Sequence, residues 1–155
     1  MGKRPDLLLL DEPVAALDPL ARRAFLASLA AAMAEGDLTV VLSSHLLPDL
    51  ERICDHLVVI ADSRPVLSGG IDELLATHKR LRAPARSANG IARQHRVISE
   101  SRTPRETTLL VELNGPVLDP AWEVESVGLE DIVLAYLAPA APASPLELAG
   151  IEGRA

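Results

Sequence analysis

Residues 7–13 are Leu7-Leu8-Leu9-Leu10-Asp11-Glu12-Pro13, an uninterrupted apolar run that ends in two adjacent acids. Four apolar residues with no polar face are typical of a parallel strand that is covered by helices on both sides. Ionised carboxylates are costly to bury without partners, so Asp11 and Glu12 belong at the carboxyl edge of the sheet. Ligands bind at this edge in open α/β sheets. Because one acid can hold Mg²⁺ through water while its neighbour positions or deprotonates a water, the stretch predicts a site for nucleotide hydrolysis.

Composition limits the class of protein. The chain has 155 residues, enough for one modest domain or a part of a larger one, and its core must be built from aliphatic residues because only 2% of the chain is aromatic. A net charge of −7 argues against general affinity for nucleic acid. The single cysteine, Cys54, excludes an internal disulfide framework and is typical of a reducing compartment. No signal peptide or membrane-spanning run is present in the sequence.

Helical and strand patterns alternate in the first 80 residues. Asp18-Pro19 has the form of a helix cap followed by proline at the first helical position. Strands and helices then alternate over about 60 residues, which predicts a βαβαβ arrangement and a parallel sheet. The expected strands are Leu7–Leu10, Thr39–Ser43 and Leu57–Ala61, the expected helices are Pro19–Glu35 and Leu47–Cys54, and a short strand and a helix at Ile71–His78 follow.

The pattern changes near Leu81. Residues 82–95 mix Ala, Arg, Pro, Ser, Asn and Gly without periodicity, and we expect them to form a linker. Two strands and the helix Leu129–Leu137 then predict a small α+β region over residues 96–137, followed by a Pro/Ala-rich tail, 138–155, that we expect to be disordered. The predicted fold class is therefore α/β, with residues 1–81 forming the parallel sheet and a small α+β appendage following it.

Positive charge is concentrated between Lys79 and Arg105, where eight of the 15 basic residues lie and Glu100 is the only acid. Such a run could bind nucleic acid or anionic lipid. More often it is a solvated linker, and the aromatic side chains that would stack on bases are missing. We therefore expect no nucleic-acid partner.

Four features occur in a fixed order: the Asp11-Glu12 pair, Ala15-Ala16-Leu17-Asp18, Ser43-Ser44-His45 and the Leu57–Ala61 strand. In this order they resemble the second half of the nucleotide-binding domain of the ATP-binding cassette (ABC) family, over roughly residues 4–81. The resemblance implies a partial P-loop NTPase-like sheet that begins at the Walker B strand. It also implies ATP and Mg²⁺ as cofactors.

The same resemblance implies a role for each polar residue of the pattern. Asp11 would hold Mg²⁺ through water, and Glu12 would be the general base for the hydrolytic water. His45 would be the switch histidine that contacts the γ-phosphate and the attacking water. Asp18, in the D-loop, would contact a second nucleotide-binding domain across a dimer. The alternatives are solvated acids at a strand end for Asp11-Glu12, a surface residue for His45 and a helix cap alone for Asp18.

Two motifs of the family are missing from the sequence. No G-x-x-x-x-G-K-S/T phosphate loop occurs in the chain, and Leu67-Ser68-Gly69-Gly70, which matches the signature tetrad, lies after His45 instead of before Asp11. We expect these glycines to form a turn before the helix at Ile71. We also expect the chain to correspond to the second half of a nucleotide-binding domain, with an exposed apolar sheet face and no ATP binding of its own.

Three functions compete on this sequence. The first is the ATPase subunit of an ABC transporter, bound at the cytoplasmic face of the membrane through membrane-spanning subunits. Residues 125–137 resemble the ending of bacterial export-type subunits, which favours an exporter. The second is a soluble ABC protein that acts on DNA or ribosomes. The third is a non-catalytic remnant or a chain with a misassigned start.

Overall fold

The computed structural model describes residues 5–36 and 38–138, so the tail predicted to be disordered lies outside the described residues, apart from Ala138. The chain divides into two compact units, with the boundary between Leu57 and Val58. The boundary differs from the predicted one at Leu81, because the residues that follow Leu81 belong to the packed core of the second unit.

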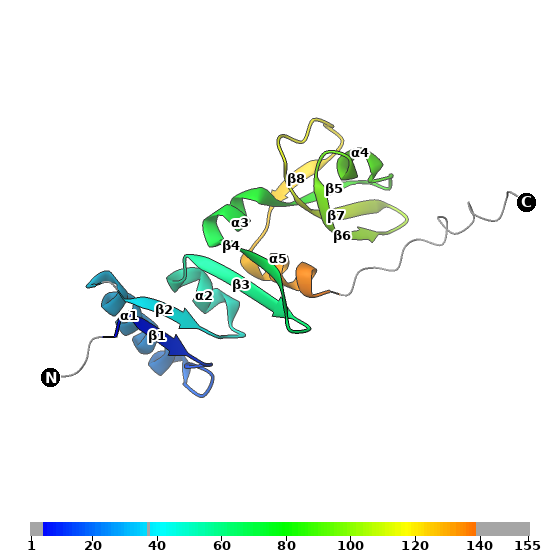
Figure 1. The fold of residues 1–155 in the computed structure, drawn as a ribbon. Helices are drawn as coiled ribbons and strands as arrows, with labels where there is room; N and C mark the ends of the chain where they lie inside the picture. The colour runs from blue at the N-terminus through cyan, green and yellow to red at the C-terminus, as the bar shows by residue number, and fades with distance from the viewer. Residues whose placement is uncertain (1–4, 37, 139–155) are drawn as a thin grey trace, which may run out of the picture. The chain divides into compact units, whose positions relative to one another are not determined.

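Two strands and two helices make up the first unit, and the predicted elements are confirmed within a residue or two at each end. Strands β1 and β2 are parallel, with Leu7 opposite Thr39 and Leu10 opposite Leu42. Helix α1 lies behind both strands in the view of Figure 1. The elements are β1 (Leu7–Leu10), α1 (Pro19–Ala34), β2 (Thr39–Leu42) and α2 (Leu47–Ile53).

One face of the two-stranded sheet carries exposed apolar side chains. Leu7, Leu9 and Val41 are 53%, 69% and 55% exposed, whereas the alternate residues Leu8 and Leu10 are half-buried. Because Leu9 is opposite Val41 in the register, these exposed side chains share one face. The expected exposed apolar face is thus confirmed, and the expected helical cover on both faces is wrong for the described residues.

The predicted third strand of the parallel sheet forms but pairs elsewhere. Strand β3 (His56–Ala61) pairs with β4 (Arg64–Gly70) in a separate two-stranded sheet. The two residues between them, Asp62 and Ser63, have φ of 49° and 60°, as a type I′ hairpin turn requires. The tight turn brings β4 directly beside β3, and this hairpin replaces the predicted pairing with β1 and β2.

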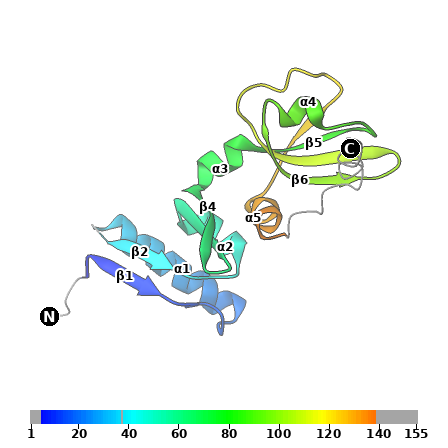
Figure 2. The same ribbon diagram turned by 45° about the vertical axis from the view of Figure 1, so that its right-hand side comes forward.

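A four-stranded antiparallel sheet with the order β6-β7-β5-β8 dominates the second unit (Figure 1). Figure 2 shows β5 and β6 of this sheet from another side. Helix α3 follows β4 directly and leads into β5. Gly69 and Gly70 are the last residues of β4, and Gly70 is the N-cap of α3. The turn predicted at these glycines is therefore wrong. The elements are α3 (Ile71–Thr77), β5 (His78–Pro84), α4 (Asn89–Ala92), β6 (Arg96–Arg102), β7 (Glu106–Glu112), β8 (Glu123–Ser126) and α5 (Leu129–Leu137).

The predicted linker over residues 82–95 is wrong. Strand β5 continues to Pro84 between β7 and β8, and Ala83, Ala88 and Ile91 are at most 5% exposed in the core of the sheet, beside Leu81 and Trp122. The sequence pattern was misleading because only alternate positions of β5 face the core, while arginines occupy the positions between them. The predicted α+β region therefore exists, but it begins at His78.

Five arginines of the basic run are paired with acids. Arg80 bonds Asp131 at 2.8 Å and Arg96 bonds Glu112 at 3.2 Å, and further ion pairs join Arg82 to Glu125, Arg86 to Asp119 and Arg102 to Glu100. All of these acids except Glu100 lie outside the 79–105 segment, so its one-sided charge in the sequence is balanced by residues brought in by folding. Most of the positive charge of the run is thus neutralised by ion pairs, and the segment is not the solvated linker that the sequence suggested.

Candidate functional site

The polar residues that follow β1 and β2 meet at one edge of the parallel sheet. The sheet hydrogen bonding continues one step beyond both strands, because the amide of Ser43 donates to the carbonyl of Leu10 at 2.8 Å. Asp11 and Glu12 therefore lie beside Ser43 and His45. This is the proximity that two adjacent parallel strands predict for their carboxyl ends.

Glu12 and His45 are in direct contact. His45 Nδ1 lies 3.1 Å from Glu12 Oε1 and 3.0 Å from Oε2. A carboxylate can only accept, so Nδ1 carries the hydrogen and the ring's Nε2 is left for another partner. The side chain of His45 is 67% exposed and that of Glu12 is 40% exposed. An ion pair this exposed to solvent contributes little to stability, so the contact matters for the geometry of the site.

Ser43 joins the two acids. Its hydroxyl donates to Asp11 Oδ1 at 2.5 Å and accepts from the backbone amide of Glu12 at 2.8 Å. One small side chain thereby holds both members of the acidic pair. From the sequence, Ser43 was expected only as a member of the Ser43-Ser44-His45 motif, with no role of its own. The role could have been predicted from the strand pairing, because Ser43 follows β2 at the position where Asp11 follows β1.

The backbone of Glu12 turns sharply away from the strand. Its φ is +45°, in the left-handed region that residues other than glycine adopt rarely. The bond from its amide to Ser43 and the bond from the Ala15 amide to its carbonyl, at 3.2 Å, hold this conformation. Such conformations cluster at functional sites, where surrounding contacts maintain them.

Asp18 does not join this cluster. Its carboxylate accepts from the amides of Leu20 and Ala21, at 2.8 and 3.0 Å, and so caps α1 as the Asp18-Pro19 pair predicts. These backbone hydrogen bonds lower the pKa of Asp18 below its ordinary value. Capping is therefore its structural role, and the contact across a dimer implied by the resemblance stays a prediction.

The donors at this edge suit a hard cation that binds through water. Asp11 supplies one exposed carboxylate, and Mg²⁺ in phosphate sites takes one or two carboxylates together with waters and phosphate oxygens. Within residues 5–36 and 38–138, no group of three or more His, Cys, Asp or Glu side chains could hold a metal ion by itself. The edge therefore fits an ion that arrives with a nucleotide, and no fully protein-made metal site lies in that part of the chain.

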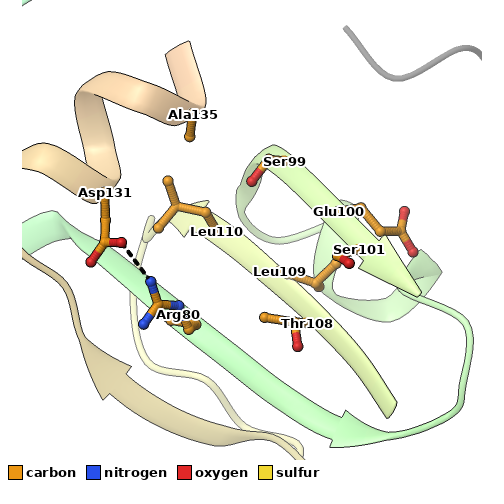
Figure 3. A pocket seen from close by; sticks show the side chains of 9 residues that line it. All are labelled: Arg80, Ser99, Glu100, Ser101, Thr108, Leu109, Leu110, Asp131 and Ala135. Atoms are coloured by element: carbon orange, nitrogen blue, oxygen red, sulfur yellow. Dashed lines mark hydrogen bonds and ion pairs between the residues drawn. The ribbon is translucent and has the colours of Figure 1, made fainter. Parts of the chain in front are cut away.

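A hollow lies on the four-stranded sheet, between α5 and the strands (Figure 3). It encloses about 230 Å³ and is lined by Ser99, Ser101 and Thr108 around the side chain of Leu110. Its arginine, Arg80, is bonded to Asp131, and Glu100 is bonded to Arg102. Since its charged groups neutralise one another, we assign it no chemistry.

About half of the chain is similar to ATP-binding proteins of ABC transporters. It is 43% identical over 76 residues to the molybdenum import ATP-binding protein ModC of Aromatoleum aromaticum and 40% identical over 74 residues to the energy-coupling factor transporter ATP-binding protein EcfA2 of Clostridium acetobutylicum. These matches cover 49% and 48% of this chain. The similarity to ABC ATP-binding proteins extends over about half of this chain.

The family includes proteins that act in opposite directions. A Nod factor export ATP-binding protein I of Mesorhizobium japonicum is 38% identical over 74 residues, 48% of this chain. The matches cover 20%, 26% and 22% of the ModC, EcfA2 and Nod factor proteins, so this chain aligns with about a quarter of the length of its curated relatives. No protein-family model matches the chain.

Proposed function

We propose that the edge formed by Asp11, Glu12, Ser43 and His45 is the hydrolytic part of the ATP site in an ABC transporter subunit. The observation that carries the proposal is the Glu12–His45 contact of 3.0 Å beside the Asp11 carboxylate. An acid that can accept a proton, an imidazole that orients it and a second acid suited to Mg²⁺ are the groups that hydrolysis of a nucleotide needs.

In this proposal Glu12 is the general base. It would accept a proton from the attacking water, while the Nδ1 hydrogen of His45 keeps its carboxylate aimed and Nε2 is free to reach the terminal phosphate or the water. Ser43 is a positioning residue, because it fixes the backbone of Glu12 and the carboxylate of Asp11. Bound Mg²⁺ would supply positive charge to the phosphates, and Asp11 would hold it through water.

Partners follow from the same proposal. Transport subunits of this family work with membrane-spanning subunits, and within the described residues no helix of this chain is long and apolar enough to cross a membrane. Attachment to the cytoplasmic face through such partners, and a contact of Asp18 with a second nucleotide-binding domain, are both part of the proposal. Export is favoured only by the ending at residues 125–137, since the relatives include both import and export proteins.

A chimeric subunit tests the assignment of the base. The matched region of the energy-coupling factor relative would be replaced by the corresponding region of this chain, and ATP binding and hydrolysis would be measured separately. Glu12→Gln should keep ATP binding and stall turnover, because an amide can position water but cannot accept its proton. Glu51→Gln, at an exposed acid on α2, is the control and should hydrolyse ATP at the chimera's own rate. Equal turnover by the chimera and its Glu12→Gln variant contradicts the proposal.

A second candidate concerns the 155-residue polypeptide itself, which we propose does not bind ATP alone. The sequence has no phosphate loop, and that loop provides most of the charge-assisted contacts to a triphosphate. Titration calorimetry with MgATP should therefore give no heat of binding, and micromolar affinity would contradict it. A role on DNA or ribosomes is less well supported, because the arginines of the 79–105 segment named above are engaged in ion pairs.

A further inference from the structure

Helices α1 and α2 border a groove in the first unit that the proposed ATP site does not use. The groove encloses about 400 Å³ and has an apolar floor that includes Leu26, Ala30 and Ile53. Its α1 side runs from Pro19 to Ala30 with residues at helical spacing, which is about 16 Å or three turns of helix. These dimensions suit one short helix lying in the groove.

The rim of the groove is positively charged in a chain that is negative overall. Arg22, Arg23 and Arg52 line it together with a single acid, Asp49, while the whole chain carries a net charge of −7. Arg23 and Arg52 are exposed, so their guanidinium groups are accessible from solvent. A partner with acidic side chains on both sides of an apolar stripe would match this pattern.

The ion pair inside the groove is loosely made. Arg22 Nη1 lies 3.7 Å from Asp49 Oδ2, beyond hydrogen-bond distance. Among the described residues, Arg22 Nε and Asp49 Oδ2 are both buried and have no hydrogen-bond partner. Buried polar atoms in native proteins are nearly always satisfied, so Arg22 and Asp49 are both under-bonded beneath the groove.

We propose that this groove binds an acidic amphipathic helix of a partner protein. Its apolar side chains would cover Leu26 and Ile53, and its carboxylates would pair with Arg23 and Arg52 at the rim. The groove is built from α1 and α2, whereas the proposed ATP site is built from the ends of β1 and β2. The inference therefore does not depend on hydrolysis.

Two synthetic peptides test the proposal on the full 155-residue chain. Each is a labelled helix of about three turns with leucine along one face, flanked by glutamate in one peptide and by lysine in the other. Fluorescence anisotropy at low salt should show binding of the glutamate peptide, with a Kd on the order of 100 μM for so small an interface, and weaker binding of the lysine peptide. Equal affinity for both, or no binding of the glutamate peptide, overturns the proposal.

Matched variants locate the binding. Arg23→Gln and Arg52→Gln should each weaken binding about fivefold, as expected when one exposed charge pair is lost, whereas Arg64→Gln, at an exposed arginine of β4, should not. Ala30→Phe should block the groove, while Ala31→Phe, at an exposed position outside its lining, should leave affinity unchanged. If the control variants lose affinity for the peptide as much as the groove variants do, the peptide does not bind in this groove. Binding to phosphatidylserine vesicles without binding to the peptide would replace the partner helix by a membrane surface and also overturn the proposal.

Discussion

Replacing Leu81 by alanine should strongly destabilise the four-stranded sheet. Leu81 is fully buried in a cluster with Ala83, Leu109, Val111 and Trp122. Three carbon atoms leave the core, which costs about 2.4 kcal/mol at about 0.8 kcal/mol each. Since β5 is paired on both sides, the site can collapse only partly, and a residual cavity of about 50 Å³ adds about 1.2 kcal/mol. The expected loss in the free energy of unfolding is about 3.6 kcal/mol.

Trp122 provides a specific assay for this change. It is the only tryptophan of the chain and is 6% exposed within the same cluster, so its fluorescence reports on the second unit alone. At about 1.5 kcal/mol per molar urea, the unfolding midpoint should fall by about 2 M. The control is Val124→Ala, opposite Leu81 on β8 but 46% exposed, which should cost less than about 1 kcal/mol. Equal midpoint shifts for the two variants would refute the placement of Leu81 in a packed core.

Further predictions concern single polar groups. Ser43→Ala should speed hydrogen exchange of the Glu12 amide, whereas Ser43→Thr keeps the hydroxyl and should not. If the Glu12 amide exchanges at the same rate in the unchanged chain and in Ser43→Ala, Ser43 does not hold the backbone of Glu12. Tyr136→Phe removes the hydroxyl 3.1 Å from the buried His78 Nε2 and should cost about 1–3 kcal/mol in Trp122-monitored unfolding. Glu130→Gln, at an exposed position of the same helix, is the control and should cost less than about 0.5 kcal/mol. The pKa of Asp18 is lowered, so its stabilisation of α1 is fully present above the ordinary value near 3.8 and is lost as pH falls through the pKa in the folded chain. Asp18→Asn should therefore lose less helix in acid, as measured by circular dichroism. An unchanged acid transition in this variant would argue against the cap. Burial raises the pKa of the Cys54 thiol, so alkylation near pH 8 should be slower in the folded chain than in urea, and equal rates would contradict the half-buried position.

Local patterns predicted the first unit well because its signals are short in range. The Leu7–Leu10 strand, the Asp18 cap and the helix that follows it each depend on neighbouring residues, and all are present. The meeting of Glu12 with His45 also followed, since two parallel strands end side by side. The family resemblance fixed the order of the polar residues but not the bridging role of Ser43.

Long-range pairing limited the prediction elsewhere. Strand β5 alternates buried residues with arginines and ends at a proline, so its sequence indicates a loop until its partners on β7 and β8 are known. Likewise, β3 is paired with β4 because a two-residue turn brings β4 beside it, and hydrophobic patterning alone cannot choose between that neighbour and β1 or β2.

The left-handed backbone of Glu12 has a consequence for how acidic pairs should be interpreted. In an extended strand, successive side chains point to opposite faces, so two adjacent acids could not serve the same ligand. The bend at Glu12, with a φ of +45°, ends that alternation directly after Asp11. Consecutive carboxylates after a strand thus form a common centre only where the chain changes direction between them. A hydroxyl on the neighbouring strand that ties the second acid's amide, as Ser43 does, is a feature by which such centres can be distinguished from ordinary charged strand ends.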